Sequence, residues 1–219
     1  MITKKKDCDH SCFMCRYVIS DWKELIKLKR KVIKVKKGEQ FLWEGSTADG
    51  VYFVQQGLVK VHKQWADKEN IIRFAKKGDI VGHRGLSHEV LNYPISATAL
   101  ESSELCFLPI DFFKTVLKTN PKLTYQLLMF CADELRVSEQ KITNQVQLTV
   151  KGRLAWNFLE LHKHMGCDAQ GHIAIALSKT DLAAYLGTTY ESVYRVLLEM
   201  IEEGAVEVNA KRIKLLDME

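Results

Sequence analysis

The sequence predicts an α+β chain in which a region of short strands is followed by one long helix and a small helical domain that ends in a hairpin. Three observations support this. Residues 31–108 hold short apolar runs with period-2 alternation, residues 120–147 contain no glycine, and residues 178–215 combine two capped helices with a basic hairpin. Such periodicities distinguish strands from helices. We therefore expect four parts: a cysteine-containing segment (1–24), a β-domain (25–119), a long helix (120–147) and a C-terminal domain (148–219).

The β-domain is predicted from alternating apolar residues. Val32-Ile33-Lys34-Val35 and Leu58-Val59-Lys60-Val61 show the alternation, which marks strands. Glycines separate these runs at turn-like intervals: Gly38, Gly45, Gly50, Gly57, Gly78, Gly82 and Gly85. Many short strands joined by glycine-containing turns are typical of a sandwich or a barrel.

The long helix is predicted to begin at Asn120-Pro121, because asparagine is a good N-cap and proline suits the first helical position. About 25–30 residues would span roughly 40 Å. Apolar residues recur along it at close to 3.5-residue spacing, which suits a coiled-coil seam: Leu128, Cys131, Leu135, Ile142 and Val146. Two partners for this stripe are considered, a second copy of the chain in a parallel homodimer and the chain's own β-domain.

The C-terminal domain contains a helix-turn-helix pattern. Ser178-Lys179-Thr180-Asp181 fits a helix-capping motif, Gly187 supplies the turn, and a second helix is expected from Tyr190 to Glu203. Its exposed face presents Glu191, Tyr194 and Arg195. Arginine matches the paired acceptors of guanine, and glutamate can accept from the cytosine amino group. A hairpin follows whose basic residues can contact phosphate: Lys211, Arg212 and Lys214.

These residues also allow plainer interpretations. Glu191 can complete a capping box with Thr188, or form an i,i+4 ion pair with Arg195. Tyr194 can pack on a neighbour instead of contacting DNA. The combination of capped helix, glycine turn, second helix and basic hairpin nevertheless favours a winged helix that binds duplex DNA.

Six segments of the chain match motifs of a known family: Lys37-Gly38-Glu39, Gly57-Leu58-Val59-Lys60, Lys77-Gly78-Asp79-Ile80-Val81-Gly82, Lys151-Gly152-Arg153-Leu154-Ala155, Asp181-Leu182-Ala183-Ala184-Tyr185-Leu186-Gly187 and Glu191-Ser192-Val193-Tyr194-Arg195. Through these segments the chain resembles the Crp/Fnr family of transcription regulators, from about Leu28 to Leu216. The resemblance implies a cyclic-nucleotide-binding-like β-roll that senses a signal, a long dimerisation helix, and a C-terminal winged helix-turn-helix. It further implies a homodimer on a palindromic operator, with RNA polymerase as a partner.

The resemblance also assigns roles to residues of the C-terminal domain. Glu191 and Arg195 fall on the family's base-reading positions. Tyr194 stands where the fumarate-nitrate reduction regulator group usually has serine, and Tyr190 where the cyclic-AMP group has a further arginine. The full set of expected DNA-binding residues is Ser178, Thr189, Tyr190, Glu191, Ser192, Tyr194, Arg195, Lys211 and Arg212.

The effector of the β-roll is not evident from the sequence. For cyclic AMP the family uses a glutamate, an arginine-serine pair and hydroxyl residues on the long helix. The corresponding segments here carry His83, Tyr93-Pro94 and Ser138-Glu139. Without the arginine, a buried cyclic phosphate would have no cationic partner, so we do not expect cyclic AMP. His83, Arg84 and Ser138 are the candidate effector-pocket residues. The alternatives for His83 and Arg84 are haem ligation, binding of another anion, and a pair satisfied within the protein.

The cysteines suggest a second kind of sensor. Cys8, Cys12 and Cys15 form a C-x3-C-x2-C pattern, and Cys106 lies far away in sequence. By resemblance to the fumarate-nitrate group, Cys12, Cys15 and Cys106 correspond to ligands of a [4Fe-4S] cluster, which ordinarily needs four thiolates. Where that group has its last N-terminal ligand, this chain has Asp21. Either Cys8 or Asp21 supplies the fourth ligand, or no cluster forms. Zinc bound by Cys8, His10, Cys12 and Cys15, and thiol redox chemistry, are the alternatives.

The composition narrows the functional class. Residues 1–7 are charged and lead into no apolar signal segment, and no apolar run approaches the roughly 20 residues that cross a bilayer, so we expect a cytoplasmic protein. The net charge of +5 permits nucleic-acid binding without requiring it. We find no phosphate loop, nucleophile elbow or catalytic triad, and expect no enzyme. The rival function is a small-ligand-binding signalling module that does not bind DNA.

Overall fold

The computed structural model describes residues 9–87, 89 and 91–217. The chain divides into two compact units. The first comprises residues 1–64 and 72–135, and the second residues 65–71 and 136–219. Each unit is considered by itself. The first unit begins with two short helices, α1 (Phe13–Tyr17) and α2 (Asp21–Lys29), which the sequence patterns did not predict.

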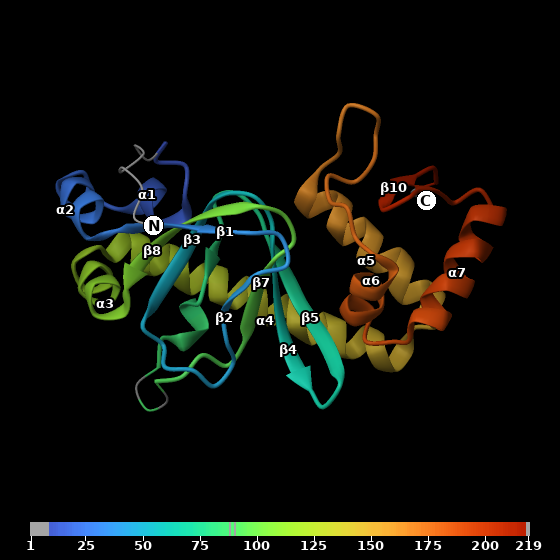
Figure 1. Cartoon of the computed structure of the whole chain (residues 1–219), viewed down its shortest axis with the longest axis horizontal. Helices are drawn as coiled ribbons and strands as arrows, with labels where there is room; N and C mark the ends of the chain where they lie inside the picture. The colour runs from blue at the N-terminus through green and yellow to red at the C-terminus, as the bar shows by residue number, and fades with distance from the viewer. Residues whose placement is uncertain (1–8, 88, 90, 218–219) are drawn as a thin grey trace. The chain divides into compact units, whose positions relative to one another are not determined.

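Two four-stranded sheets form the β-domain (Figure 1). One has the order β1-β8-β3-β6 and the other β2-β7-β4-β5. The strands are β1 (Lys31–Val35), β2 (Gln40–Leu42), β3 (Gly50–Gln56), β4 (Val59–Trp65), β5 (Lys68–Ala75), β6 (Ile80–Val81), β7 (Ser96–Ala99) and β8 (Ser103–Pro109). A 3-10 turn, η1 (His83–Gly85), follows β6. The short strands and glycine turns expected of a β-roll are therefore confirmed.

Side chains on both faces of β3 and β8 are buried, and strand alternation decides which side chain enters which core. Tyr52 and Val54 of β3 lie in the core between the two sheets. Val51 and Phe53 point the other way and pack with α1, α2 and α3 (Ile110–Thr119), which lie beside this sheet in Figure 1. We call the second group the helix-side core. The same alternation along β8 places Cys106 in it.

The long helix α4 runs from Pro121 to Gln147, 27 residues, as the pattern predicted. Asn120 precedes its first residue, but the expected side-chain cap is wrong. The Asn120 amide donates to the carbonyl of Val116 at 2.8 Å and its oxygen accepts from the N–H of Ile19 at 3.0 Å. These two bonds join the end of α3 to the segment before α2, because this asparagine is buried where both partners are in reach.

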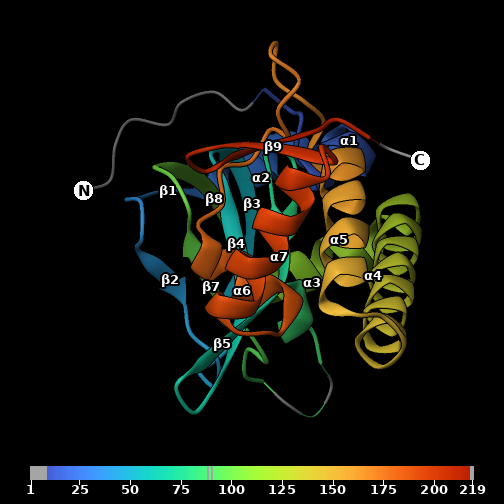
Figure 2. The same cartoon turned by 90° about the vertical axis from the view of Figure 1, so that its right-hand side faces the viewer.

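The second unit contains the helices α5 (Val150–Met165), α6 (Lys179–Leu186) and α7 (Tyr190–Glu202), and the hairpin β9 (Val206–Asn209) and β10 (Arg212–Leu215) (Figure 2). Helix α5 buries Leu154, Asn157, Phe158 and Leu161. Its N-cap is Thr149, whose hydroxyl accepts from the N–H of Gly152. The helix-turn-helix followed by a hairpin is present as predicted.

Candidate nucleic-acid interface and sensor residues

The two helices of the helix-turn-helix are capped by their own side chains. Ser178 Oγ accepts from the N–H of Asp181 at 3.0 Å, so the predicted cap of α6 is confirmed. Helix α7 is capped by Thr189, whose hydroxyl accepts from the N–H of Ser192 at 3.3 Å. Thr188 is not the cap. Caps of this kind fix where a helix starts, and here they fix which residues of α7 stand in its first turn.

Helix α7 has one buried and one exposed face. Val193, Val196, Leu197 and Met200 are buried, while Glu191, Tyr194 and Arg195 are exposed and Ser192 is half-buried. Within the described part of the chain, neither Glu191 nor Arg195 forms a hydrogen bond or an ion pair. The i,i+4 pair considered above is therefore not formed. Both side chains are available to an external partner near the helix N-terminus.

Tyr190 and Tyr194 stack on this exposed face. Their ring centroids lie 6.3 Å apart and their planes differ by 6°. The ammonium of Lys179, the first residue of α6, lies 5.1 Å from the centre of the Tyr194 ring. Tyr194 thus packs on neighbours and is exposed at the same time, so the two interpretations of this residue do not exclude each other.

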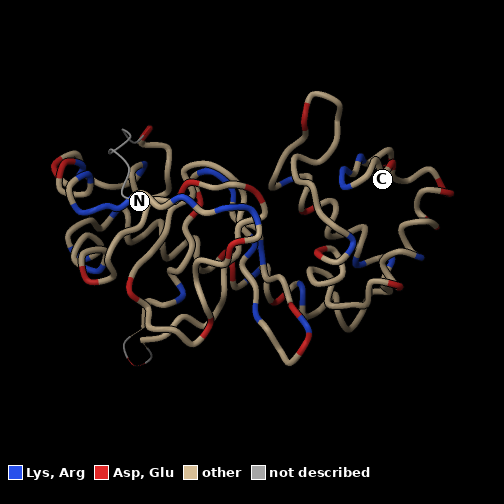
Figure 3. Tube along the Cα trace, in the orientation of Figure 1, with Lys and Arg blue, Asp and Glu red and all other residues tan. Residues whose placement is uncertain are grey.

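The hairpin supplies the basic residues expected of a wing (Figure 3). Lys211 lies in the turn after Ala210, whose φ is 56°, and is exposed. Arg212 is exposed as well, but its guanidinium lies 3.4 Å from the carboxylate of Asp168. This surface ion pair is weak and leaves the arginine able to exchange partners. Lys214 is half-buried and its stem packs near Gly171.

The carbonyl of Leu186, at the turn between α6 and α7, accepts two side-chain hydrogen bonds. Gln145 Nε2 of α4 donates at 3.0 Å and Arg153 Nη1 of α5 at 3.3 Å. One residue earlier, the ammonium of Lys141 lies 3.7 Å from the centre of the Tyr185 ring. Burial lowers the pKa of Lys141 to about 7, although Glu160 opposes the shift. Sequence patterns did not reveal these contacts, because all of them join residues distant in the chain.

In the β-domain, Arg73, His83 and Arg84 converge on the carboxylate of Glu134 from α4. We call these four residues the Glu134 ion cluster. Arg73 Nε lies 2.6 Å from Glu134 Oε1, His83 Nε2 lies 2.9 Å from Oε2, and Arg84 Nη2 lies 3.2 Å from Oε2. The ring of Phe130 packs against both Arg73 and His83. Sequence patterns point to His83 and Arg84 but not to their shared partner Glu134.

The Glu134 ion cluster is largely buried, and burial shifts its pKa values. Desolvation lowers the pKa of His83, although the hydrogen bond to Glu134 opposes this. Burial alone would raise the pKa of Glu134, but the bond from His83 and the neighbouring cations outweigh it and bring the pKa to about 2. His83 Nε2 is bonded to Glu134, whereas its Nδ1 is buried with no hydrogen-bond partner among the described residues. Ser138, the third effector candidate, follows Glu134 by one helical turn and is half-buried.

Three of the candidate metal ligands lie in the helix-side core. Cys12 is the N-cap residue of α1, Cys15 lies within that helix, and Cys106 lies on β8; all three are buried. The N–H of Phe13 donates to the carbonyl of Gly78 at 2.8 Å and fixes the start of α1. Cys8 lies outside the described residues.

The described residues do not by themselves complete a metal site. In the part of the chain that the structure describes, no three His, Cys, Asp or Glu side chains are arranged to hold a metal ion. Asp21 is exposed at the start of α2 and accepts from the Ser20 hydroxyl at 3.1 Å, and His10 is exposed. Neither one joins Cys12, Cys15 and Cys106. Among the described residues, Cys12, Cys15 and Cys106 thus share the helix-side core without forming a group of three metal ligands.

The predicted seam residues of α4 are exposed in the single chain. Leu128, Leu135, Ile142 and Val146 keep 63%, 60%, 66% and 83% of their surface, and Cys131 is also exposed. Different residues of α4, Leu123 and Leu127, are buried in the helix-side core. In the first unit, the seam residues Leu128, Cys131 and Leu135 therefore do not pack against the β-domain, because another face of the helix makes that contact.

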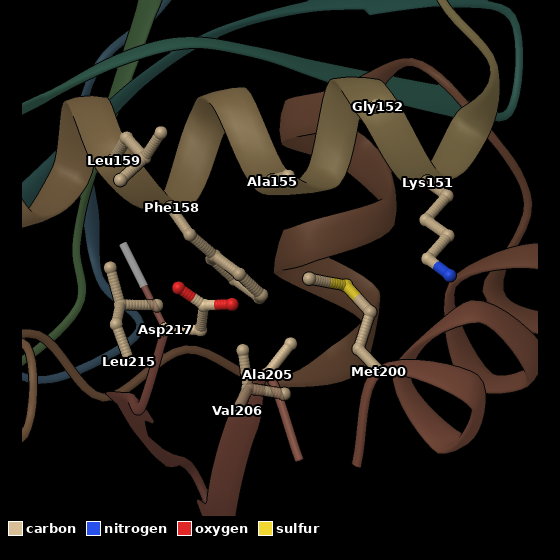
Figure 4. A pocket seen from close by; sticks show the side chains of 10 residues that line it. All are labelled: Lys151, Gly152, Ala155, Phe158, Leu159, Met200, Ala205, Val206, Leu215 and Asp217. Carbon is tan, nitrogen blue, oxygen red and sulfur yellow. The ribbon is translucent and has the colours of Figure 1, made fainter. Parts of the chain in front are cut away.

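A pocket of about 230 Å³ lies in the second unit between α5, the end of α7 and the hairpin (Figure 4). Its lining is mostly apolar, with Lys151 and Asp217 as the charged residues. Met200 contributes to it from the buried face of α7. The pocket is thus on the opposite side of α7 from Glu191 and Arg195.

No helix among the described residues is long and apolar enough to cross a membrane.

Comparison with known proteins identifies two domains. The family model of the cyclic nucleotide-binding domain matches residues 32–120, and that of the Crp-like helix-turn-helix domain matches residues 152–219.

Curated relatives extend over almost the whole chain. The transcriptional activator protein anr of Pseudomonas aeruginosa is 27% identical over 218 residues, which cover 97% of this chain and 88% of the relative. The anaerobic regulatory protein of Bacillus subtilis is 28% identical over 195 residues, with 88% and 82% covered.

Solved structures show the same fold. FixK2 from Bradyrhizobium japonicum aligns with a TM-score of 0.76 at 24% identity and covers 86% of this chain and 93% of that one. A CooA mutant from Carboxydothermus hydrogenoformans aligns with a TM-score of 0.76 at 20% identity, with 91% and 89% covered. The two domain matches and the curated relatives, together with the capped helix-turn-helix and the β-roll, show that the chain belongs to the Crp/Fnr family of DNA-binding transcription regulators.

Proposed function

We propose that the chain binds a palindromic operator as a homodimer and reads its bases with Glu191 and Arg195. The observation that carries this proposal is the exposed, unpartnered face that these two residues form on the capped helix α7. The N-terminal part of a recognition helix is the part that meets base edges in the major groove. The remaining proposed DNA contacts are Ser178, Thr189, Tyr190, Ser192, Tyr194, Lys211 and Arg212.

The exposed seam of α4 supports the homodimer. A stripe of large apolar side chains at 3.5-residue spacing is stabilised when it packs against an identical stripe. Two recognition helices related by a two-fold axis then meet half-sites about one DNA turn apart, roughly 34 Å. RNA polymerase is the further partner that family membership suggests, and duplex DNA as the target supports action in the cytoplasm.

The proposed role of Arg195 is tested by Arg195→Ala. Loss of a bidentate contact to guanine costs about 1–3 kcal/mol of discrimination, so specific binding to a selected operator should fall about fivefold to 150-fold in a gel-shift titration. Lys163→Ala is the matched control, because it removes a positive charge from an exposed position of α5 in the same domain. Equal affinity and sequence preference in the Arg195 variant would contradict the assignment.

The match of residues 152–219 to a Crp-like helix-turn-helix favours a regulator over a signalling module that does not bind DNA. The relatives are transcription regulators, which supports a regulatory and not a catalytic role for this chain. We further propose that the β-domain senses the signal.

One proposed sensor is a [4Fe-4S] cluster held by Cys8, Cys12, Cys15 and Cys106. The spacing of the cysteines, the shared burial of three of them and the name of the Bacillus relative support it. Four thiolates would bind the cluster, whose redox chemistry would make the regulator responsive to oxygen. Thiol oxidation without a metal is the second candidate, supported by the same buried cysteines.

Anaerobic purification followed by iron and sulfide analysis tests the cluster. The expected result is about four iron and four sulfide per chain, with a brown colour, and loss of both in Cys106→Ser. Cys167→Ser is the control, since Cys167 is exposed and lies in the second unit. Colourless, iron-free protein from anaerobic cells, with normal regulation by the Cys106 variant, would reject this sensor.

For the effector pocket, we propose that His83, Arg84 and Ser138 respond to a ligand other than cyclic AMP. Tyr93, at the position aligned with the cyclic-phosphate arginine, is buried and donates to the carboxylate of Asp49 at 2.8 Å. Glu134 already pairs with Arg73 and Arg84, so an anionic effector would compete with it for these guanidinium groups.

A further inference from the structure

The stacked tyrosines of α7 form an exposed aromatic surface beside the proposed base readers. Tyr190 and Tyr194 keep 46% and 43% of their surface exposed although their rings are parallel. Lys179 lies over the Tyr194 ring at 5.1 Å. We call these three residues the tyrosine plate. Stacking and the cation contact hold both rings in one arrangement, so binding to them costs little side-chain entropy.

The position of the plate follows from helix geometry. Successive residues of a helix rotate by about 100°. Around the helix, Glu191 therefore lies in the middle, with Tyr190 and Tyr194 to one side of it and Arg195 to the other. The contact with Lys179 shows that the tyrosine side faces the start of α6. In a helix-turn-helix the first helix crosses the DNA backbone while the second enters the groove. The plate therefore lies between the expected backbone contact and the base readers.

The chemistry of the plate differs from that of its neighbours. Glu191 and Arg195 offer charged groups, which match the polar edges of cytosine and guanine. The plate offers ring carbons. In the major groove the only apolar group among the four bases is the 5-methyl of thymine. A pair of fixed, half-exposed rings on this face matches that methyl group.

We propose that the tyrosine plate is a specificity determinant that contacts the 5-methyl group of a thymine in each half-site, next to the base pairs read by Glu191 and Arg195. The inference rests on the proposed role of α7 as the reading helix, and it adds the identity of a base to that role.

Deoxyuridine substitution tests the proposal, because it removes the methyl group and keeps every hydrogen-bonding atom of thymine. The preferred half-site is first selected from randomised duplexes with the full chain. Each thymine is then replaced by deoxyuridine in turn, symmetrically in both half-sites. At one position the wild-type protein should lose about fourfold in affinity per methyl group, which corresponds to the roughly 0.8 kcal/mol of burying one such group.

Two variants connect this loss to the plate. Tyr194→Ala should bind the thymine and deoxyuridine probes equally well, because the ring that contacts the methyl group is gone. Tyr194→Phe keeps the ring and should keep the methyl effect. Uniform weakening of the phenylalanine variant on every duplex would instead assign the hydroxyl to a phosphate contact and overturn the proposal.

The deoxyuridine series on the wild-type protein also stands without the variants, should Tyr194→Ala fail to fold. Unchanged affinity at every thymine position overturns the plate while leaving the roles of Glu191 and Arg195 intact. If Arg195→Ala has no effect on the selected sequence, the proposed reading helix itself is wrong. These two failures are therefore distinguishable.

Discussion

At the scale of single residues, Glu134 shows how one side chain can organise a buried polar site. Its carboxylate is the common partner of Arg73, His83 and Arg84. Removing one member of a buried ion pair leaves the other charge uncompensated, which costs more than the pair itself contributes. Glu134 is thus the residue that holds the three other members of the cluster together.

Glu134→Gln should destabilise the first unit by about 3 kcal/mol, the lower part of the range for breaking a buried pair. The reason is that Arg73 then has no counter-charge within the cluster. Urea unfolding followed by tryptophan fluorescence and circular dichroism measures the change. Glu139→Gln, an exposed position on the same helix, is the control and should shift the midpoint little. Equal midpoints for the two variants would show that the cluster does not stabilise the fold.

The same cluster predicts a loss of stability in acid. The pKa of His83 is lowered by burial, so protonation below its ordinary value of 6.5 favours the unfolded chain. The pKa of Glu134 falls from 4.5 to about 2, so its contribution is present above pH 4.5 and is lost as the pH falls towards 2. Unfolding midpoints measured from pH 7 to pH 3 should therefore decrease. In Glu134→Gln the part of the decrease below pH 4.5 should be smaller, and an unchanged slope there would contradict this account.

At the scale of elements, the turn between α6 and α7 is held by backbone geometry and by side chains from two other helices. Gly187 has a φ of 63°, a conformation that costs other residues about 1–2 kcal/mol. A Cβ built there would lie 2.4 Å from Gln145 Nε2. The glycine therefore serves both the turn and the hydrogen bond from Gln145 to Leu186.

Gly187→Ala should destabilise the second unit by about 1–2 kcal/mol and weaken operator binding, because the turn is strained and the Gln145 amide must move. Gly152→Ala is the matched control. Gly152 lies in α5, and the nearest atom to its added Cβ is at 3.4 Å. The control should be neutral or slightly stabilising, since alanine favours helix. Thermal unfolding and gel-shift titration compare the two, and identical behaviour would remove the special role of the turn.

At the scale of the whole molecule, the exposed seam of α4 predicts the oligomeric state. Leu135→Gln combined with Ile142→Gln should give a monomer and reduce operator affinity, because a two-fold related pair of reading helices is lost. Val137→Gln is the control, since Val137 lies about half a turn away from the seam on the same helix. Light scattering after gel filtration measures the mass. A seam variant that remains dimeric would place the interface elsewhere.

Local features of the structure could be predicted from the sequence, whereas features that depend on long-range contacts could not. Strand alternation, the Ser178 cap, the glycine turn and the length of α4 could be predicted, because each depends on residues a few positions apart. The helices α1, α2 and α3 were missed, since they are short and owe their stability to packing in the helix-side core.

The sequence by itself determined the family, the order of the domains and the exposed face of α7, since these follow from motifs and periodicity. Only the tertiary structure decided that Glu134 binds His83 and Arg84, that Gln145 holds the turn at Leu186, and that Cys106 joins Cys12 and Cys15 in one core. The physical reason is the same for all three. Hydrogen bonds, ion pairs and buried packing depend on distances in space, and residues 41 to 94 positions apart leave no periodic pattern that records them.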